Sequence, residues 1–556
     1  MNPTIRRKTW IIIICTCLFV AGLYVGYLSA NNSRQADSYS KFTTVFDYIL
    51  GDYVDEISPD SLAEMAIPAL IKNLDPHSHY IPANDVERTN RDLESTFFGI
   101  GVQFQMMNDT VCIVEIVSGG PAERVGVKAG DRIVEVNGKA FTGDSINNEK
   151  VQNTLRGAKD TTVSIKVKRS TSEELLPFDI VRGEIPSTSV DASHLIDENI
   201  GYIRLSKFAP NTYAEFLQAL NSLFSRGATH FILDLRGNSG GLLDQAILIS
   251  NEFLKPMRTI VEVRGRHSKE NANWLADGLG AFTDEPLVVL MDEFSASSSE
   301  IVAGAIQDND RGLVVGRRSF GKGLVQRLIT LPDSSQMRLT VQRYYTPSGR
   351  SIQKEYKLGK DDKYETEILD RYTNGEVFKI DSTKIDTAKI FHTVGGRTVY
   401  GGGGILPDVF VPSDTTDVTS YYLSVANAGL LNRYAFEYAD LNRDSLVGAK
   451  NVGDLLAKLP PDGVLLQAFT KYAADKGVAR RWYYINISSK LIVKQLQALI
   501  ARDILGMSAY FEIINSTDPT VNEAVKQLRY GVDKTIDKAI KDEQERNSQA
   551  NQATQE

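Results

Sequence analysis

Apolar and polar residues alternate with different periods in successive parts of this chain. Apolar residues recur at helical spacing in residues 40–50 and 61–74, whereas residues 161–169 alternate one by one, as strands do. Continuous apolar runs at 230–235 and 287–291 predict buried strands, and alternating strands and helices around them predict a mixed or mostly parallel sheet. The pattern as a whole predicts an α/β protein of several domains. We expect a helical region at 31–95, a strand-rich domain at 96–183, an α/β domain at 186–412, a helical extension at 415–541 and a disordered polar tail at 542–556.

Residues 10–30 form an uncharged, mostly apolar segment. Its length is enough to cross the hydrocarbon core of a bilayer. Arg6, Arg7 and Lys8 precede it, which predicts a cytoplasmic tail at 1–9 and an exported remainder, in the periplasm or cell envelope. A cleaved signal peptide is the alternative to this transmembrane anchor. The residues before Cys15 and Cys17 are not the small ones expected before a lipid-modified cysteine.

Composition narrows the functional classes. The chain has 556 residues, of which 42% are hydrophobic and 24% charged, so it is globular and long enough for about three or four domains. A net charge of -8 argues against general nucleic-acid binding. Cys112 is the only cysteine after the apolar segment, so no intrachain disulfide is expected there. His77 and His79 lack a nearby third ligand, so we expect no metal site and no cofactor.

The strand-rich domain carries an ordered series of turn motifs. It opens on Gly99-Ile100-Gly101-Val102, continues through a short helix at Pro121, and then has a strand that ends in the Asn137-Gly138 turn. A helix at 149–156 and the strand at 161–169 complete the series. This order resembles a PDZ domain.

A PDZ domain binds the C-terminal tail of a protein as an added strand. The backbone amides of Gly99, Ile100 and Gly101 are candidates to receive the free carboxylate, beside a strand that begins near Val102. Further candidates on the facing helix are Val151 and Leu155, which would line a pocket for the last side chain, and Arg156, which would sense the carboxylate, brace the active form, or simply be solvated.

Two residues of the α/β domain suggest its chemistry. Ser297 follows a buried strand and begins a helix, and Lys322 lies between glycines in Phe320-Gly321-Lys322-Gly323. A serine hydroxyl needs a base, and a buried lysine can serve because burial disfavours its charged form. Gln326 is a candidate to orient the lysine amine.

The turn at 236–241 also ends a strand, so it should meet Ser297 at one edge of the sheet. Candidate donors for an oxyanion are the amide of Ser298 and those of Gly240 and Gly241.

Three alternatives compete with this interpretation. Ser297 and Glu300 also have the spacing of a helix capping box. Gly316 to Lys322 approaches a phosphate-binding loop, but Gly323 replaces the Ser or Thr that would bind Mg²⁺. A histidine base is a third option, although none of the six histidines lies in a motif that places it beside Ser297.

Several motifs occur together with the PDZ-like unit: Pro76-His77-Ser78, the Asp234-to-Gly241 segment, the Ser295-to-Glu300 segment, Phe320-Gly321-Lys322-Gly323 and Pro347-Ser348-Gly349-Arg350. Together they resemble the carboxyl-terminal processing, or tail-specific, proteases of the S41 family over residues 40–412. The resemblance implies a crotonase/ClpP-like α/β core, with Ser297 as nucleophile, Lys322 as base and Gln326 as its positioning partner. It says nothing about residues 415–556.

The sequence therefore predicts a membrane-anchored serine endopeptidase that captures apolar C-terminal tails and cleaves them. Its expected partners are protein substrates and the membrane, with an adaptor or a second copy as further options. The first alternative is a catalytically silent PDZ scaffold, which the intact Ser297, Lys322 and Gln326 argue against. The second is an enzyme for small acyl substrates, which would have no use for a peptide groove.

Overall fold

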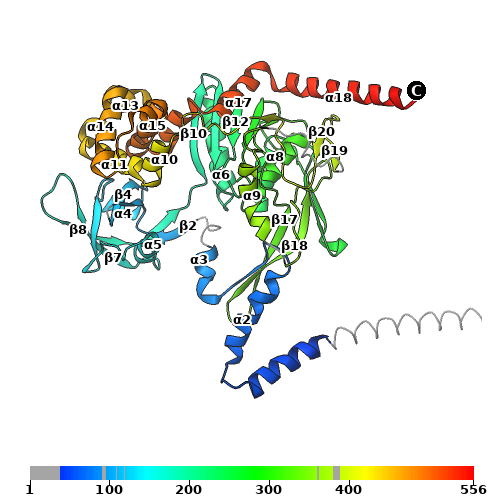
Figure 1. Ribbon diagram of the computed structural model, residues 1–556, viewed down its shortest axis with the longest axis horizontal. Coiled ribbons are helices and arrows are strands. Elements are labelled where there is room, and N and C mark those ends of the chain that lie inside the picture. Colours follow the sequence, from blue (N-terminus) through cyan, green and yellow to red (C-terminus); the bar gives the residue numbers. More distant parts are fainter. Residues whose placement is uncertain are drawn as a thin grey trace, which may run out of the picture. The chain divides into compact units, whose positions relative to one another are not determined.

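The computed structural model describes residues 38–90, 96–107, 109–117, 119–359, 362–379 and 389–555 (Figure 1). The chain divides into two units, Met1–Leu74 and Asp75–Glu556. In the first unit, residues 38–52 are helical and α2 spans Pro59–Lys72, so both predicted helices are present. The Ser58 hydroxyl caps α2 by accepting a hydrogen bond from the amide of Ser61 at 3.1 Å. The apolar segment at 10–30 lies outside the described residues, and none of the described helices is long and apolar enough to cross a bilayer.

A six-stranded sheet forms the centre of the second unit. Its strands in spatial order are β10 (Val190–Asp197), β11 (Ile200–Leu205), β12 (His230–Asp234), β15 (Leu287–Met291), β16 (Leu313–Gly316) and β21 (Val409–Phe410). The strands from β11 to β21 are parallel, and β10 is antiparallel at the edge. This arrangement confirms the predicted mostly parallel sheet.

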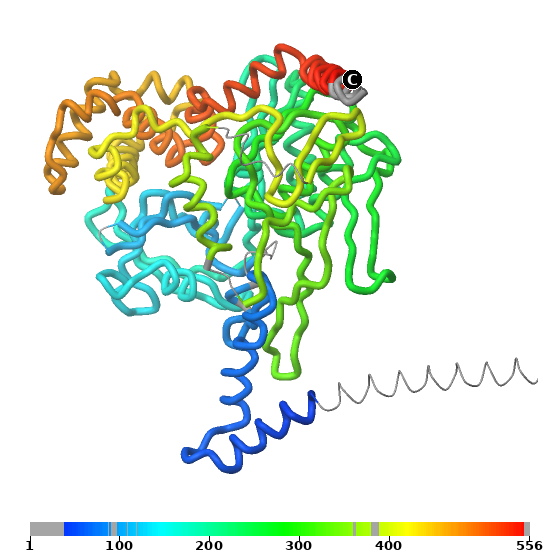
Figure 2. The backbone as a smooth tube through the Cα atoms, turned by 45° about the vertical axis from the view of Figure 1, so that its right-hand side comes forward, coloured from blue at the N-terminus to red at the C-terminus, as the bar shows by residue number. Residues whose placement is uncertain are grey.

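Helices cover both faces of this sheet, which is why its strands are continuously apolar. On one face lie α6 (Thr212–Ser225), α7 (Leu243–Asn251) and α8 (Ser298–Asp308), packed on residues such as Leu233 and Val289. On the other face, Ile232 and Val288 pack against α17 (Pro519–Tyr530) and the start of α18 (Val532–Gln555). The end of the chain, red in Figure 2, thus returns to the green central sheet and completes its core.

A second sheet lies beside the first and carries the lysine segment at one end. It is made of β1 (His79–Ile81), β18 (Gln336–Tyr345), β13 (Thr259–Gly265) and β14 (Ala272–Leu275), with β17 (Leu324–Thr330) paired to β18. The polar stretch at 354–392 contains helix α9 (Asp362–Thr373) and the strand β19 (Ile390–His392), which pairs with β20 (Thr398–Tyr400). Short elements before it are η1 (Ala83–Asp85), α3 (Val86–Asn90) and η3 (Ser268–Glu270).

The strand-rich domain has the arrangement of a PDZ domain, in which two helices pack against a β-sheet. Its sheet runs β3 (Val102–Met107), β4 (Thr110–Ile116), β5 (Arg132–Val136), β7 (Thr162–Lys168) and β8 (Leu176–Val181), with β6 (Lys139–Ala140) on β5. The helices are α4 (Pro121–Arg124) and α5 (Asn148–Leu155), and β2 (Thr96–Gly99) pairs with β9 (Gly183–Pro186). Because β3 is the last strand of this sheet, its outer edge is available to an added strand.

Helices dominate the chain after residue 419, as the sequence predicted. They are α10 (Ser420–Asn427), α11 (Leu430–Leu441), α12 (Arg443–Leu446), α13 (Val452–Lys458), α14 (Asp462–Asp475), α15 (Trp482–Leu505) and α16 (Met507–Asn515). These seven helices share one core. The end of the chain differs from the predicted disordered tail, because α18 continues through residues 542–555. Val532 and Ile536 bury the first turns of α18 on the central sheet, and Glu543 accepts a hydrogen bond from Thr398. The polar residues that follow therefore extend a helix whose start is already packed on a core.

Arg350 and Asp308 form a fully buried ion pair at 2.7 Å inside the α/β domain. We expect Arg350→Met to lower the free energy of unfolding by about 3–5 kcal/mol, because removing one partner of a buried ion pair leaves the other without compensation. The control is Arg264→Met, which removes an exposed pair with Glu262 and should cost less than about 1 kcal/mol. Urea unfolding followed by fluorescence measures both, and equal losses in the two variants would contradict the expectation.

Candidate active site

Ser297 lies at the turn between β15 and α8, at the carboxyl end of the central sheet. Its backbone angles are φ 55° and ψ -113°, a combination that costs of order 1–3 kcal/mol in a residue with a side chain. Ala296 and Ser298 on either side are buried, whereas Ser297 is partly exposed. The surrounding structure therefore holds this serine in a strained conformation that presents it at the surface of the core.

The glycine turn after β12 packs directly against Ser297. A Cβ atom on Gly240, whose φ is 100°, would lie 2.7 Å from Cβ of Ser297 and 2.8 Å from the carbonyl of Ala296. Only glycine allows this approach. The Ser298 hydroxyl donates to the carbonyl of Gly241 at 2.9 Å and fixes the turn to the helix start.

This contact also distinguishes the three amides that the sequence proposed as oxyanion donors. The amide of Gly240 already donates to Oδ1 of Asn238 at 2.9 Å. Within the described residues, the amides of Ser298 and Gly241 have no hydrogen-bond acceptor. Gly240 therefore allows the turn to approach Ser297 closely, and the amides without an acceptor are those of Ser298, next to Ser297 in the chain, and Gly241, next to Gly240.

Glu300 links the serine turn to the lysine loop. Its carboxylate is fully buried, and Oε2 accepts hydrogen bonds from the amides of Ser297 at 2.8 Å and Lys322 at 2.9 Å. Oε1 accepts from the amide of Gly321 at 2.7 Å and from the hydroxyl of Ser319 at 2.5 Å. Burial raises the pKa of Glu300, and these four donors oppose that rise. One carboxylate oxygen therefore binds the backbone of both residues that the sequence singled out.

Tyr344 on β18 makes a second link between the same two segments. Its hydroxyl lies within hydrogen-bond distance of the carbonyls of Ser297, at 3.1 Å, and of Lys322. The side chain is 1% exposed, and burial raises the pKa of Tyr344 well above its usual range, so the hydroxyl keeps its proton and remains a donor. Glu300 on the amide side and Tyr344 on the carbonyl side thus fix Ser297 and Lys322 relative to each other.

The electrostatic surroundings of Lys322 favour its neutral form. Burial lowers the pKa of its amine, and the positive charge of Arg338 lowers it further, while Glu300 and Asp75 act in the opposite direction. This is the direction that a lysine base requires.

Gln326 lies on the strand β17, not on a helix. Its amide donates to the carbonyl of Leu324 at 3.4 Å and to Oγ1 of Thr340 at 3.3 Å, both long contacts. Among the described residues, no hydrogen bond joins Gln326 to the Lys322 amine. Its role as the positioning partner stays a prediction.

The loop at 75–78 lies next to the lysine, which the sequence did not predict. Thr340 donates to Asp75 at 2.9 Å through its hydroxyl and to Ser78 at 3.0 Å through its amide. The His77 ring pairs with the Tyr364 hydroxyl at 2.7 Å, and burial, then the charge of Lys322, lowers the pKa of His77 to about 4. His77 is therefore a neutral side chain within the field of Lys322, and the described residues contain no cluster that could hold a metal ion.

Helix α9 holds the loop that precedes Lys322. The guanidinium of Arg371, 1% exposed, donates to the carbonyls of Arg318 at 3.0 Å, Ser319 at 2.8 Å and Phe320 at 3.2 Å. The buried Lys354 ammonium lies 3.9 Å from the centre of the Phe320 ring and donates to the carbonyl of Tyr364. The polar composition of this stretch does not predict that function, because the carbonyls that Arg371 binds lie about 50 positions earlier in the chain.

The candidate peptide-binding residues of the PDZ domain lie together. Ile100, Val151 and Leu155 are buried in its core, with Val102 packed against them. The predicted side-chain pocket is thus filled by the domain's own residues in this structure.

Arg156 lies beside the glycine loop at 99–101. Its guanidinium is 3.9 Å from the centre of the Phe97 ring, and the Cγ of Arg156 would be 3.6 Å from a Cβ on Gly99. Within the described residues, the amides of Ile100 and Gly101 have no hydrogen-bond acceptor. The arginine, the glycine loop and these amides therefore share one end of β3.

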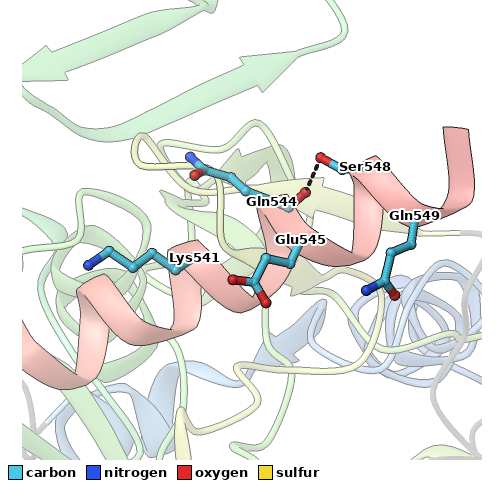
Figure 3. A pocket seen from close by; sticks show the side chains of 5 residues that line it. All are labelled: Lys541, Gln544, Glu545, Ser548 and Gln549. Carbon is cyan, nitrogen blue, oxygen red and sulfur yellow. Dashed lines mark hydrogen bonds between the residues drawn. The ribbon is translucent and has the colours of Figure 1, made fainter. Parts of the chain in front are cut away.

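A hollow along α18 is a different kind of feature (Figure 3). Five exposed residues line it: Lys541, Gln544, Glu545, Ser548 and Gln549. All belong to one helix, and the Ser548 hydroxyl donates to the carbonyl of Gln544 one turn earlier. It is the side of an exposed helix and contains none of the groups described above.

Comparison with known proteins agrees with this geometry. Peptidase family S41 matches residues 199–363, the PDZ domain family matches residues 99–179, and a family of unknown function (DUF8443) matches residues 421–506. A carboxy-terminal-processing protease of Bartonella bacilliformis is 36% identical over 349 residues, which cover 60% of this chain and 79% of that protein. The carboxy-terminal processing protease CtpA of Bacillus subtilis is 32% identical over 359 residues, 63% of this chain and 76% of that protein.

Among solved structures, the photosystem II D1 C-terminal processing protease is 28% identical, with 56% of this chain and 83% of that chain covered and a TM-score of 0.34. The resemblance drawn from the sequence motifs is confirmed by the curated relatives. The chain belongs to the carboxy-terminal processing proteases, serine-type hydrolases of peptidase family S41 that carry a PDZ domain.

Proposed function

We propose that this protein is an endopeptidase in which Ser297 is the nucleophile and Lys322 its general base. The observation that carries the proposal is the double link through Glu300 and Tyr344, which joins the backbones of these two residues from opposite sides. The lowered pKa of Lys322 supports the same assignment, because only the neutral amine can accept a proton from the serine.

The reaction follows from these positions. The Ser297 hydroxyl attacks a peptide carbonyl while the Lys322 amine takes its proton, and the carbonyl oxygen becomes an oxyanion. In this proposal the amides of Ser298 and Gly241, which have no acceptor among the described residues, donate hydrogen bonds to the oxyanion. The lysine then returns the proton to the leaving amine, and a water molecule, activated by the same lysine, hydrolyses the acyl-enzyme. The cycle uses no metal and no cofactor.

The substrate in this proposal is the C-terminal tail of a protein. The free edge of β3 would take the tail as an added strand, and the loop Gly99-Ile100-Gly101 would receive its carboxylate, with Arg156 beside it. Ile100, Val151 and Leu155 are apolar, so we expect the last residue of the tail to be apolar as well. Because these three side chains are buried in the PDZ core, α5 would have to shift to admit that residue.

We further propose that residues 10–30 anchor the protein, with the protease outside the cytoplasm. The uncharged segment and the basic residues before it support this membrane anchor.

Ser297→Ala and Lys322→Ala should each lower kcat for a reporter with an apolar C-terminal tail by at least about 10⁴-fold, because each removes one half of a unit that acts together. Gel analysis of the cleaved reporter measures the loss, and circular dichroism confirms folding. Tail binding without cleavage by the unmodified protein would favour the silent scaffold. Cleavage that survives Lys322→Ala would transfer the role of base to another group, of which His77 is the first to test.

Tyr344→Phe should lower kcat about tenfold or more, since the two carbonyls lose a buried donor and the serine and lysine segments lose their second link. Tyr345→Phe is the matched control, one residue along the same strand and free of contacts with either segment among the described residues. Steady-state kinetics with the tailed reporter compares the two, and an equal effect of both substitutions would argue against the link.

Arg338→Gln should move the acidic limb of the pH profile of kcat/KM to higher pH. The Arg338 charge lowers the pKa of Lys322, so its removal raises that pKa, and a higher pH is then needed to neutralise the amine. Arg343→Gln on the same strand is the control, because Arg343 does not act on Lys322. A profile that moves to lower pH, or does not move, would be inconsistent with a lysine base at this position.

A further inference from the structure

The PDZ strand β4 is buried on both faces. Val111 and Ile113 point into the core of the PDZ domain. Cys112, which alternates with them, is 1% exposed and packs with Met107 and Val114 around Phe436. Phe436 belongs to α11 of the helical region, so that region covers the outer face of the PDZ sheet.

Helix α11 divides its residues between two partners. Leu431, Ala435 and Ala439 pack into the core of the helical region. Phe436 and Asp440, four residues apart and therefore on one side of the helix, turn towards the PDZ domain instead. A helix with a second buried side is typical of an element that joins two domains.

A buried ion pair accompanies the aromatic contact. Asp440, whose side chain is 5% exposed, accepts a hydrogen bond from Arg132 of β5 at 3.0 Å, and the Arg132 guanidinium lies 5.5 Å from the centre of the Phe436 ring. A Cβ atom on Gly130 would lie 2.4 Å from Oδ1 of Asp440. Since Gly130 also has a φ of 95°, the PDZ turn at this position fits Asp440 only as glycine.

The helical region is also attached to the protease sheet. The Ser508 hydroxyl of α16 donates to the carbonyl of Ser193 on the edge strand β10 at 3.2 Å, and the Arg204 guanidinium lies 4.6 Å from the centre of the Phe511 ring. The same helical core therefore contacts the PDZ domain through α11 and the catalytic domain through α16.

The contact leaves the peptide-binding side of the PDZ domain uncovered. Phe436 and Asp440 meet the outer face of β4 and β5, whereas α5 closes the inner face and β3 forms the free edge. A cavity of about 160 Å³ remains between the two domains, lined by Met107, Thr110, Cys112, Arg132, Phe436 and Glu437. The contact is therefore not packed throughout as a domain core is.

We propose that residues 420–515 are a docking module for the PDZ domain of this same chain, which fixes the PDZ domain on the protease so that a captured tail is delivered to Ser297. This gives a function to the region that matches a family of unknown function. The proposal rests on the proposed protease activity for its second half, delivery to Ser297. Its first half, the docking, can be measured without any catalysis.

Cys112 provides a probe of the docked state. The full chain with Cys15→Ser and Cys17→Ser has Cys112 as its only thiol. In the docked protein this thiol is buried, and burial raises its pKa to about 11, so reaction with a thiol reagent such as DTNB is slow. Undocking would expose it while the PDZ core, on the other face of β4, stays intact.

The experiment compares Phe436→Ala with Leu441→Ala in that background. Leu441 is on the same helix but 80% exposed, so its removal should change nothing. We expect Phe436→Ala to raise the rate of Cys112 modification by at least about tenfold. Binding of a labelled peptide with an apolar C-terminus, followed by fluorescence anisotropy, should stay within about threefold, while kcat for a reporter with the same tail falls about tenfold or more. Phe436→Leu should restore part of the protection and part of the activity.

Two results would overturn the docking: fast modification of Cys112 in the parent protein, or continued protection in Phe436→Ala. Full activity of a Phe436→Ala protein whose Cys112 has become reactive would overturn the delivery role. Complete absence of cleavage by the parent protein would instead refute the proposed protease function, and the thiol rates would still decide whether the helical region docks the PDZ domain.

Discussion

The geometry of the candidate active site depends on a buried carboxylate whose partners are mostly backbone amides. Glu300 accepts hydrogen bonds from Ser297, Ser319, Gly321 and Lys322, and through them it fixes a strained serine turn to a glycine-flanked lysine loop. A carboxylate in this position is stable only while all four donors stay in place, because an unpaired buried charge is costly. The strain at Ser297 is retained for the same reason: the turn cannot relax without breaking a bond to Glu300.

Residues and helices around Glu300 also stabilise the serine turn and the lysine loop. Arg371 of α9 binds the three carbonyls that lead into the lysine loop, and Tyr344 closes the carbonyl side of both segments. Beyond them, α17 covers the second face of the catalytic sheet, and the helices before it hold the PDZ domain. The chain after residue 415 is therefore part of both the protease core and the proposed route of the substrate, although the family resemblance does not extend to it.

Much of this organisation could be predicted from sequence, because it rests on local signals. The runs 230–235 and 287–291 gave the buried strands, and the glycine turns gave the PDZ domain and the serine turn. Glu300 was recognised only as a helix cap, and its bonds to Gly321 and Lys322 span more than 20 residues, which no local pattern encodes. The same limit applies to Arg371, whose three acceptors are carbonyls some 50 positions earlier. Gly240 shows a finer limit: the sequence correctly placed it beside Ser297, but only the structure shows that Asn238 already uses its amide.

The proposed serine–lysine pair faces a conflict between the structural and the chemical role of Glu300, and the hydrogen bonds of Glu300 resolve it. A carboxylate next to the lysine holds the loop, yet it also raises the pKa of the amine and favours the charged, inactive form. Here both oxygens of Glu300 accept hydrogen bonds from backbone amides and a hydroxyl. Lys322 donates to Glu300 through its backbone amide and not through its side-chain amine. Burial lowers the pKa of the Lys322 amine, and the positive charge of Arg338 lowers it further, so both act against the remaining attraction of Glu300. The lysine loop thus gains a rigid anchor while its amine remains able to accept a proton.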